Sequence, residues 1–220
     1  MNNLDANQFC PYRTIHRETD IEFTERKSLF IGHAKPVSTE SEAIDYIAKQ
    51  RTRYRDATHN VYAYRLRNNH ICRYSDDGEP QGTAGLPVLD IIRKNDLYDI
   101  CLVVTRYFGG ILLGTGGLVR AYSKSAKSAV DQAEILSAEL FLEFEISAGY
   151  SDFEKIQREA ASFSAVIEHV QYEATVSASF SLRPDVAEKF CFRVSELSAG
   201  RVRPIPSGER LILRPVDCKA

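Results

Sequence analysis

Residues 100–133 constrain the fold of this 220-residue chain more than any other segment. Residues 100–108 form a near-continuous apolar run, which is typical of a central β-strand covered on both faces. Five glycines follow within residues 109–117, and helical character resumes over residues 118–133. A strand that leads through glycines into a helix leaves unpaired backbone N–H groups at the positive end of the helix dipole. The segment therefore predicts a cradle for an anion, either phosphate or carboxylate.

Two arginines flank these glycines and strengthen the prediction. Arg106 precedes them and Arg120 follows them, and a guanidinium can make paired hydrogen bonds to an anion. The spacing matches neither a Walker A loop nor the dinucleotide-binding fingerprint. The alternative is that the glycines only make tight turns or close contacts between helix and strand. The residues of the candidate anion cradle are Arg106, Gly109, Gly110, Gly114, Gly116, Gly117 and Arg120.

The polar loop over residues 75–86 is a second candidate site. It carries three carboxylates within four residues, which could bind a divalent cation or serve as general acid and base. Asp-Gly and Glu-Pro are also common in turns, so a turn or an electrostatic partner for arginines is the favoured interpretation, with no bound metal or other cofactor. His59, at the start of a strand, is either a base or, as favoured, a hydrogen-bonded cap. This acidic loop group comprises His59, Asp76, Asp77, Glu79 and Thr83.

A third candidate is a cluster of six arginines within residues 51–73, interleaved with tyrosines. Positive charge at the end of a helix is favourable by itself, so a solvated helix terminus explains part of the cluster. Arginines beside exposed aromatic rings are also typical of proteins that follow an RNA backbone and stack on its bases. The candidate nucleic-acid contacts in this cluster are Arg51, Arg53, Arg55 and Arg65.

The remaining pattern indicates an α+β protein with two domains, residues 1–133 and 138–220. In the first domain, Thr39 and Glu42 form a capping box that predicts a helix over residues 40–53. The second domain has the order β-α-β-β-α-β of a ferredoxin-like unit. The other predicted strands of the first domain are 14–18, 28–37, 60–66 and 70–74, with a helix at 88–94. Those of the second are 139–146, 166–173, 175–182, 201–206 and 211–216, with helices at 151–162 and 184–200.

Charge and composition narrow the class of protein. The formal net charge is −2, which excludes a broadly basic nucleic-acid binder. Residues 1–133 nevertheless hold 18 basic and 16 acidic side chains, against 10 and 14 in residues 134–220, so a focused basic surface remains possible in the first domain. Five scattered cysteines predict reduced thiols, and no apolar run approaches the ~20 residues that cross a membrane. We therefore expect a cytoplasmic monomer.

With these motifs, the chain resembles the YigZ/IMPACT family, as a bacterial two-domain member. The resemblance rests on residues 56–60, 75–80, 82–85 and, most specifically, 103–122. It implies a first domain that is a βα sandwich similar to domain two of ribosomal protein S five. It implies a ferredoxin-like second domain similar to modules of elongation factor G. Eukaryotic relatives are linked to translational control through the initiation-factor kinase pathway by protein contacts, and the resemblance carries over no catalytic residue.

Two functions follow as hypotheses. The first is a translation-associated regulatory or binding protein that contacts RNA or the ribosome, or a regulatory protein partner, through a basic, glycine-rich surface. The second is an enzyme acting on a phosphorylated or nucleotide substrate. In that enzyme Arg106 would neutralise developing charge, and the acidic loop would hold Mg²⁺ or move a proton. The second hypothesis requires the carboxylates to lie within about 10 Å of the glycines, in one cleft.

Overall fold

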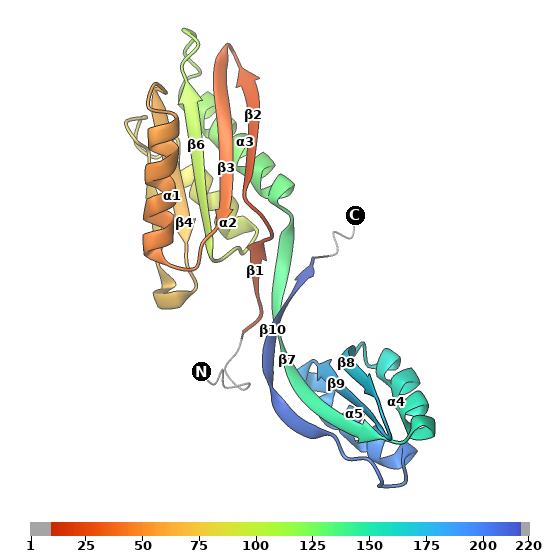
Figure 1. The fold of residues 1–220 in the computed structure, drawn as a ribbon. Coiled ribbons are helices and arrows are strands. Elements are labelled where there is room, and N and C mark those ends of the chain that lie inside the picture. The colour runs from red at the N-terminus through yellow and green to blue at the C-terminus, as the bar shows by residue number, and fades with distance from the viewer. Residues whose placement is uncertain (1–9, 217–220) are drawn as a thin grey trace. The chain divides into compact units, whose positions relative to one another are not determined.

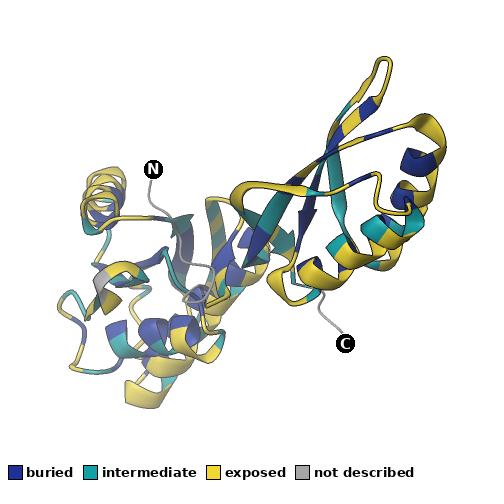
Figure 2. Ribbon diagram, turned by 90° about the horizontal axis from the view of Figure 1, so that it is seen from below, coloured by how far each residue is buried: buried dark blue, intermediate teal, exposed yellow. Residues whose placement is uncertain are grey.

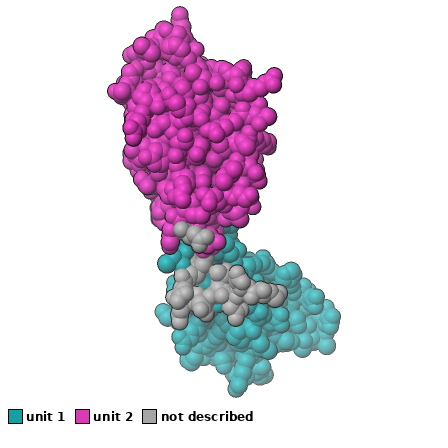
Figure 3. All heavy atoms as spheres, turned by 90° about the vertical axis from the view of Figure 1, so that its left-hand side faces the viewer, with its two compact units in different colours: residues 1–11, 138–214 teal, residues 12–137, 215–220 magenta. Residues whose placement is uncertain are grey.

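The structure, a computed structural model, describes residues 10–216 of the chain (Figure 1). The chain divides into two compact units, which Figure 3 shows in different colours. Residues 12–137 form most of one, here called the N-terminal unit, and residues 138–214 form most of the other, the C-terminal unit. Each unit has a buried hydrophobic core of its own, so the protein is an α+β protein with two domains.

The N-terminal unit is an antiparallel sheet with helices on both faces (Figure 1). α1 (Glu40–Arg53) packs on one face, and α2 (Gly85–Lys94) and α3 (Thr115–Ala133) pack on the other. The strand order is β2-β3-β6-β4-β5, which places the apolar strand β6 at the centre, as its sequence predicts. The strands are β2 (Thr19–Glu25), β3 (Ser28–Pro36), β4 (His59–Arg65), β5 (Cys72–Ser75) and β6 (Ile100–Tyr107).

Alternating side chains of β6 build a separate core on each face of the sheet. Leu102 and Val104 belong to the core beneath α2 and α3, whereas Cys101 and Val103 belong to the core beneath α1. Figure 2 shows buried segments along the strands and exposed ones on the outer sides of the helices. Because side chains two positions apart share a face, Arg106 projects from the same face as Val104, toward α3.

The C-terminal unit has the predicted β-α-β-β-α-β order. β7 pairs antiparallel with β9, which pairs antiparallel with β8, and β10 lies beside β7 on the other side. Two helices and the sheet bury a core that contains Phe153, Phe180 and Phe190. The elements are β7 (Ile135–Ala148), α4 (Tyr150–Ser162), β8 (Val166–Tyr172), β9 (Val176–Leu182), α5 (Pro184–Leu197) and β10 (Ile205–Pro215). Strand β1 (Tyr12–Ile15) belongs to the N-terminal unit.

Helix α1 has the predicted limits because its first turn is capped by side chains. Thr39 Oγ1 accepts the N–H of Glu42 at 3.2 Å, and the Glu42 carboxylate accepts the N–H of Ser38 at 2.7 Å. Ser151 and Glu154 have the same spacing and predict a second capping box, which is wrong: α4 begins at Tyr150, after Gly149, with no side-chain cap. A capping box needs the first residue of the motif to precede the helix, and Ser151 already lies inside it.

Strand β2 is missing from the sequence prediction, which placed a single strand at residues 14–18. The chain instead forms β1 up to Ile15 and then β2, whose Ile21 and Phe23 pack against the core beneath α2 and α3. β2 is an edge strand of the sheet. Exposed acidic side chains, Asp20 and Glu22, alternate with Ile21 and Phe23, so the strand is less apolar than β3 or β6 and harder to predict. Likewise, β10 is one continuous strand rather than two, and α2 and α3 each begin three residues earlier than predicted.

Four of the five cysteines lie within the described residues. Cys10, Cys72, Cys101 and Cys191 are free thiols, and Cys218 lies outside the described residues. Burial raises the pKa of the Cys101 thiol, so this group is an inert part of the core. No helix within residues 10–216 is long and apolar enough to cross a membrane.

Candidate functional site

The candidate site is centred on the C-terminal end of strand β6 and the first turn of helix α3. His59 and Phe30 lie directly opposite Arg106 on the two neighbouring strands, β4 and β3. Residues opposite each other in an antiparallel sheet project from the same face, so all three side chains point toward α3. The acidic loop follows β5 and reaches the same region. Strand register therefore brings together residues that are up to about 75 positions apart in the sequence.

A buried ion pair forms the base of this site. Arg106 is 5% exposed and Glu79 is 9% exposed, and Arg106 Nη1 donates to Glu79 Oε1 at 2.6 Å. The hydroxyl of Tyr122, on α3, donates to the same carboxylate oxygen at 2.7 Å. Burial, followed by the charge of Glu79, raises the pKa of Tyr122, which keeps this hydroxyl protonated as a donor. The pair thus ties the acidic loop to β6 and α3.

His59 is fixed with one ring nitrogen turned toward the ion pair. Its Nδ1 lies 2.8 Å from the carbonyl oxygen of Asp77. A carbonyl oxygen only accepts hydrogen bonds, so Nδ1 carries the hydrogen. In the neutral ring the other nitrogen, Nε2, is then a proton acceptor, and it lies 3.8 Å from Glu79 Oε1. The geometry of His59 therefore suits a base as well as a cap.

The other carboxylates of the acidic loop hold the backbone in place. Asp76 accepts the N–H groups of Gly82, Ala84 and Gly85, which caps the start of α2. Asp77 accepts the N–H of Asn60 at 2.7 Å and pairs with Arg51. Thr83 donates its hydroxyl to the Pro80 carbonyl. Since the three carboxylates have different partners, they do not converge on one cation, and no group of three potential metal ligands occurs in the described part of the chain.

Two of the predicted glycines are required by geometry. A Cβ atom at Gly109 would lie 2.0 Å from the backbone oxygen of Lys27, so only glycine lets the β6–α3 connection pass the β2–β3 turn. Gly114 has a φ of 71° and is the N-cap of α3, without a side chain to cap it. Leu118 N–H donates to the Gly114 carbonyl, so the N–H groups of residues 115–117 have no acceptor within the helix.

A pocket of about 430 Å³ lies beside Arg106 and the start of α3 and is here called the Arg106 pocket. Its polar wall includes Thr58, His59, Glu79, Arg106 and Thr115. Its apolar wall includes Pro80, Phe108, Leu112, Leu113 and Leu118. Gly114 also lines it, so Glu79 and the glycine connection share one cleft, whereas Asp76 and Asp77 do not line it. A mostly apolar pocket with a few convergent polar groups is typical of a small-molecule site.

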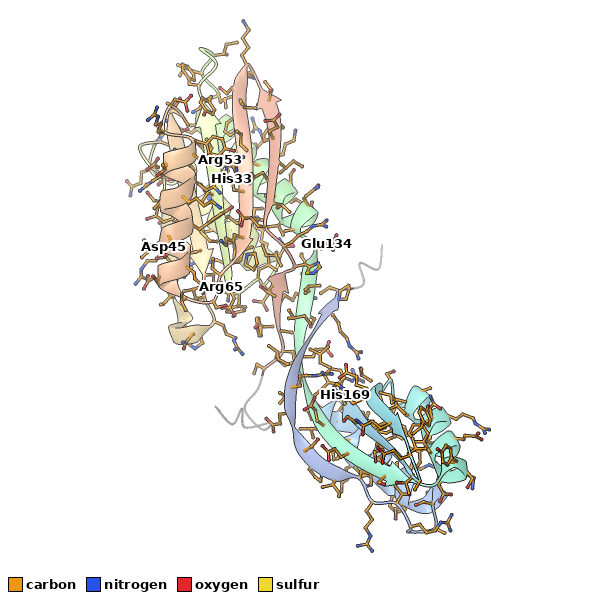
Figure 4. All side chains as sticks on the ribbon, in the orientation of Figure 1. His33, Asp45, Arg53, Arg65, Glu134 and His169 are labelled. Atoms are coloured by element: carbon orange, nitrogen blue, oxygen red, sulfur yellow. The ribbon has the colours of Figure 1, made fainter. Side chains whose placement is uncertain are left out.

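The arginines predicted as nucleic-acid contacts do not form one free surface. Arg53 pairs with Asp20 at 2.8 Å, and Arg65 pairs with Asp96 at 3.2 Å while it stacks on the ring of Tyr98. Figure 4 places Arg53 near His33 and Arg65 toward the other end of the sheet. Arg51 is paired with Asp77, as described above. Arg55 is exposed and has no ion pair with any residue that the structure describes.

Arg120 belongs instead to a second hollow, of about 240 Å³, on the other side of Leu113. Arg26 and Lys124 line this hollow together with Arg120, and Glu25 is its one carboxylate among the described residues. Arg26 and Lys27 form the β2–β3 turn with φ of 44° and 65°, the left-handed conformation of a two-residue hairpin. The sequence pattern does not point to Arg26, Lys27 or Lys124, because it predicts no β2 and hence no hairpin that brings Arg26 to the Arg120 and Lys124 side of α3.

Comparisons with known proteins agree with this architecture. Residues 26–130 match the Impact N-terminal domain, and residues 146–201 match the domain of unknown function DUF1949. A crystal structure of a hypothetical protein has a TM-score of 0.56 at 27% identity, with 89% of this chain and 96% of that chain covered.

The chain is also similar to IMPACT family proteins along most of its length. It is 38% identical over 191 residues to IMPACT family member YvyE of Bacillus subtilis, covering 86% of this chain and 88% of that protein. It is 29% identical over 181 residues to IMPACT family member YigZ of Escherichia coli, covering 81% and 89%. Protein IMPACT-A of Xenopus tropicalis is 39% identical over 106 residues, 46% of this chain and 32% of that protein. The two matched domains and these relatives show that the chain belongs to the IMPACT family.

Proposed function

We propose that this chain is a cytoplasmic, translation-associated protein that contacts RNA, free or in the ribosome, through a basic surface of its N-terminal unit. This basic surface consists of Arg26, Lys27, Arg120 and Lys124. The observation that carries the proposal is that none of the four has an ion pair with a carboxylate in residues 10–216, whereas Arg51, Arg53 and Arg65 do. The family resemblance supports the link to translation.

Unpaired cations favour a polyanion because they gain the most from its phosphates. An arginine already paired with a carboxylate must give up that pair to bind a phosphate, whereas Arg120 and Lys124 need not.

The test is the salt dependence of RNA binding, measured by fluorescence anisotropy with a single-stranded RNA that has a 5′-hydroxyl end. Each phosphate contact that is lost should reduce the slope of log K against log salt by about 0.7. We expect Arg120→Gln and Lys124→Gln each to produce a reduction of this size. Lys189→Gln, which removes an exposed positive charge on α5 without an ion pair among the described residues, is the matched control.

Two results would argue against RNA binding by this surface. One is a wild-type protein that neither binds the RNA nor sediments with ribosomes at low salt. The other is an equal loss of affinity in Lys189→Gln and Arg120→Gln, which would show that only the net charge of the chain matters.

A second candidate function is catalysis on a phosphorylated or nucleotide substrate in the Arg106 pocket. One observation favours it. Nε2 of His59, a proton acceptor in the neutral ring, lies beside Glu79, and His59 is directly opposite Arg106 on the neighbouring strand. A base in this position can take a proton from water or a hydroxyl while the guanidinium stabilises negative charge. Phosphate release from nucleotides and phosphorylated RNA, measured for wild type and His59→Gln, tests it; equal release by both proteins would exclude the role of His59.

A further inference from the structure

The Arg106 guanidinium has a hydrogen-bond partner within the described chain at only one of its three nitrogens, Nη1. Nη1 is engaged by Glu79, and the rings of Phe30 and Phe108 lie 5.5 Å and 5.4 Å from the guanidinium carbon. Nε is fully buried and has no hydrogen-bond partner, and Nη2 has none among the described residues. A buried donor without an acceptor costs about 1–3 kcal/mol. Such donors are rare in native proteins, and a functional role or a bound ion or water is among their explanations.

The unpartnered edge is the one that binds oxyanions in pairs. Nε–H and the adjacent Nη2–H are parallel, so together they match two oxygens of a phosphate or carboxylate. The pair Arg106–Glu79 is electrically neutral overall, which leaves the pocket without the excess negative charge that Glu79 alone would give. Glu79 therefore holds Arg106 through Nη1, while Nε and Nη2 keep donors without a protein acceptor among the described residues.

The first turn of α3 supplies further donors on the opposite wall. Thr115 and Gly114 line the pocket, and the N–H of Thr115 lacks an acceptor within the helix, whereas Gly117 lines the second hollow. The N-terminal end of a helix also carries partial positive charge. The donors that line the pocket include the two of the guanidinium, the N–H of Thr115 and the hydroxyl of Thr115. The three terminal oxygens of a phosphomonoester can accept them.

We propose that the Arg106 pocket binds a phosphomonoester whose phosphate lies between Arg106 and the start of α3, and whose attached group is a flat, largely apolar ring. The apolar wall with Phe108, Leu112 and Leu118 would contact that ring. A volume of about 430 Å³ falls in the range of small-ligand pockets, roughly 300–1,000 Å³. A nucleoside monophosphate, free or as the 5′ end of an RNA, has this chemistry. This site is a different pocket from the proposed RNA surface, and it deepens the second candidate function by naming a ligand class for the Arg106 pocket without requiring catalysis.

Isothermal titration calorimetry with AMP, adenosine and inorganic phosphate tests the proposal. We expect AMP to bind at least tenfold more tightly than either adenosine or inorganic phosphate, because only AMP engages both walls. AMP has no phosphodiester backbone, so failure of the basic surface would not affect this result. Failure to bind AMP would likewise leave the salt-dependent RNA binding intact.

A pair of variants at one position isolates the backbone donor. Thr115 is the first residue of α3, where proline is well tolerated, so Thr115→Pro removes one N–H while the helix is retained. Thr115→Val removes the hydroxyl but keeps that N–H, and it is the reference for the proline variant. Loss of a hydrogen bond to a charged group should weaken AMP binding about tenfold in Thr115→Pro relative to Thr115→Val. Arg106→Lys, which keeps a positive charge but lacks the parallel donors, should weaken it at least as much.

Competition with RNA distinguishes the two sources of the phosphate. Displacement of AMP by a 5′-phosphorylated RNA but not by the same RNA with a 5′-hydroxyl would extend the site to RNA ends; no displacement by either would confine it to free nucleotides. Equal affinity for AMP and adenosine, or for AMP and inorganic phosphate, would overturn the proposal. So would equal affinity of the two Thr115 variants, provided that circular dichroism shows both to be folded.

Discussion

Replacing Arg106 with methionine should destabilise the N-terminal unit more than any single change at its surface. The substitution keeps an unbranched side chain in place of the aliphatic part of Arg106, beside Phe30 and Phe108. It leaves the Glu79 carboxylate, which is 9% exposed, with only the Tyr122 hydroxyl as a hydrogen-bond donor within the described chain. Breaking a buried ion pair by removal of one partner costs about 3–5 kcal/mol, because the remaining charge stays buried.

That cost is a large fraction of the stability of a typical domain, which is about 5–15 kcal/mol. For a unit the size of residues 12–137, 1 kcal/mol shifts the unfolding temperature by roughly 3–5 °C, so we expect a fall of roughly 10–20 °C. Urea unfolding and thermal unfolding, both followed by circular dichroism, measure the two quantities.

The double variant Arg106→Met/Glu79→Gln is the decisive comparison. It removes both charges, so no uncompensated ion remains buried, and an uncharged pair can replace a buried ion pair at little net cost. We expect it to be more stable than Arg106→Met alone, with a coupling free energy of about 2–3 kcal/mol in the double-mutant cycle. Two results would refute this reasoning. One is a loss in the free energy of unfolding below about 1 kcal/mol in Arg106→Met, as expected for an exposed ion pair. The other is additive losses in the double-mutant cycle, which would mean that Arg106 and Glu79 do not stabilise each other.

Two further predictions concern the fold around the site. Burial lowers the pKa of His33, despite the hydrogen bond of this ring to Asp20. The neutral ring therefore stabilises the folded state fully above the unfolded-state pKa, near 6.5, and this stabilisation is lost as the pH falls below that value. Urea unfolding at pH 7.5 and 5.5 should show lower stability at pH 5.5, and His33→Gln should reduce that difference. Gly109→Ala should unfold at a lower temperature because its Cβ would collide with the Lys27 backbone, whereas Gly149→Ala, with no atom within 4 Å of a Cβ, should melt like wild type.

Local patterns in the sequence determine much of the secondary structure. The apolar run of β6 predicts a central strand because full burial on both faces leaves no polar alternation. The limits of α1 follow from Thr39 and Glu42, whose capping contacts lie within four residues of each other. The order of elements in the C-terminal unit is likewise predicted from periodicity. The glycines after β6 indicate a turn that opens a helix, and Gly109 and Gly114 do occupy such positions.

Which side chains meet at the site is decided by tertiary structure. The local sequence does not identify Glu79, rather than Asp76 or Asp77, as the partner of Arg106. The local sequence also does not show that Arg51 pairs with a carboxylate whereas Arg120 has no ion pair within the described residues. Strand register places His59 opposite Arg106, and a shift by one residue would turn either side chain to the other face. These outcomes depend on contacts between residues that are distant in the chain, because the energy of a buried charge depends on the three-dimensional neighbours that surround it.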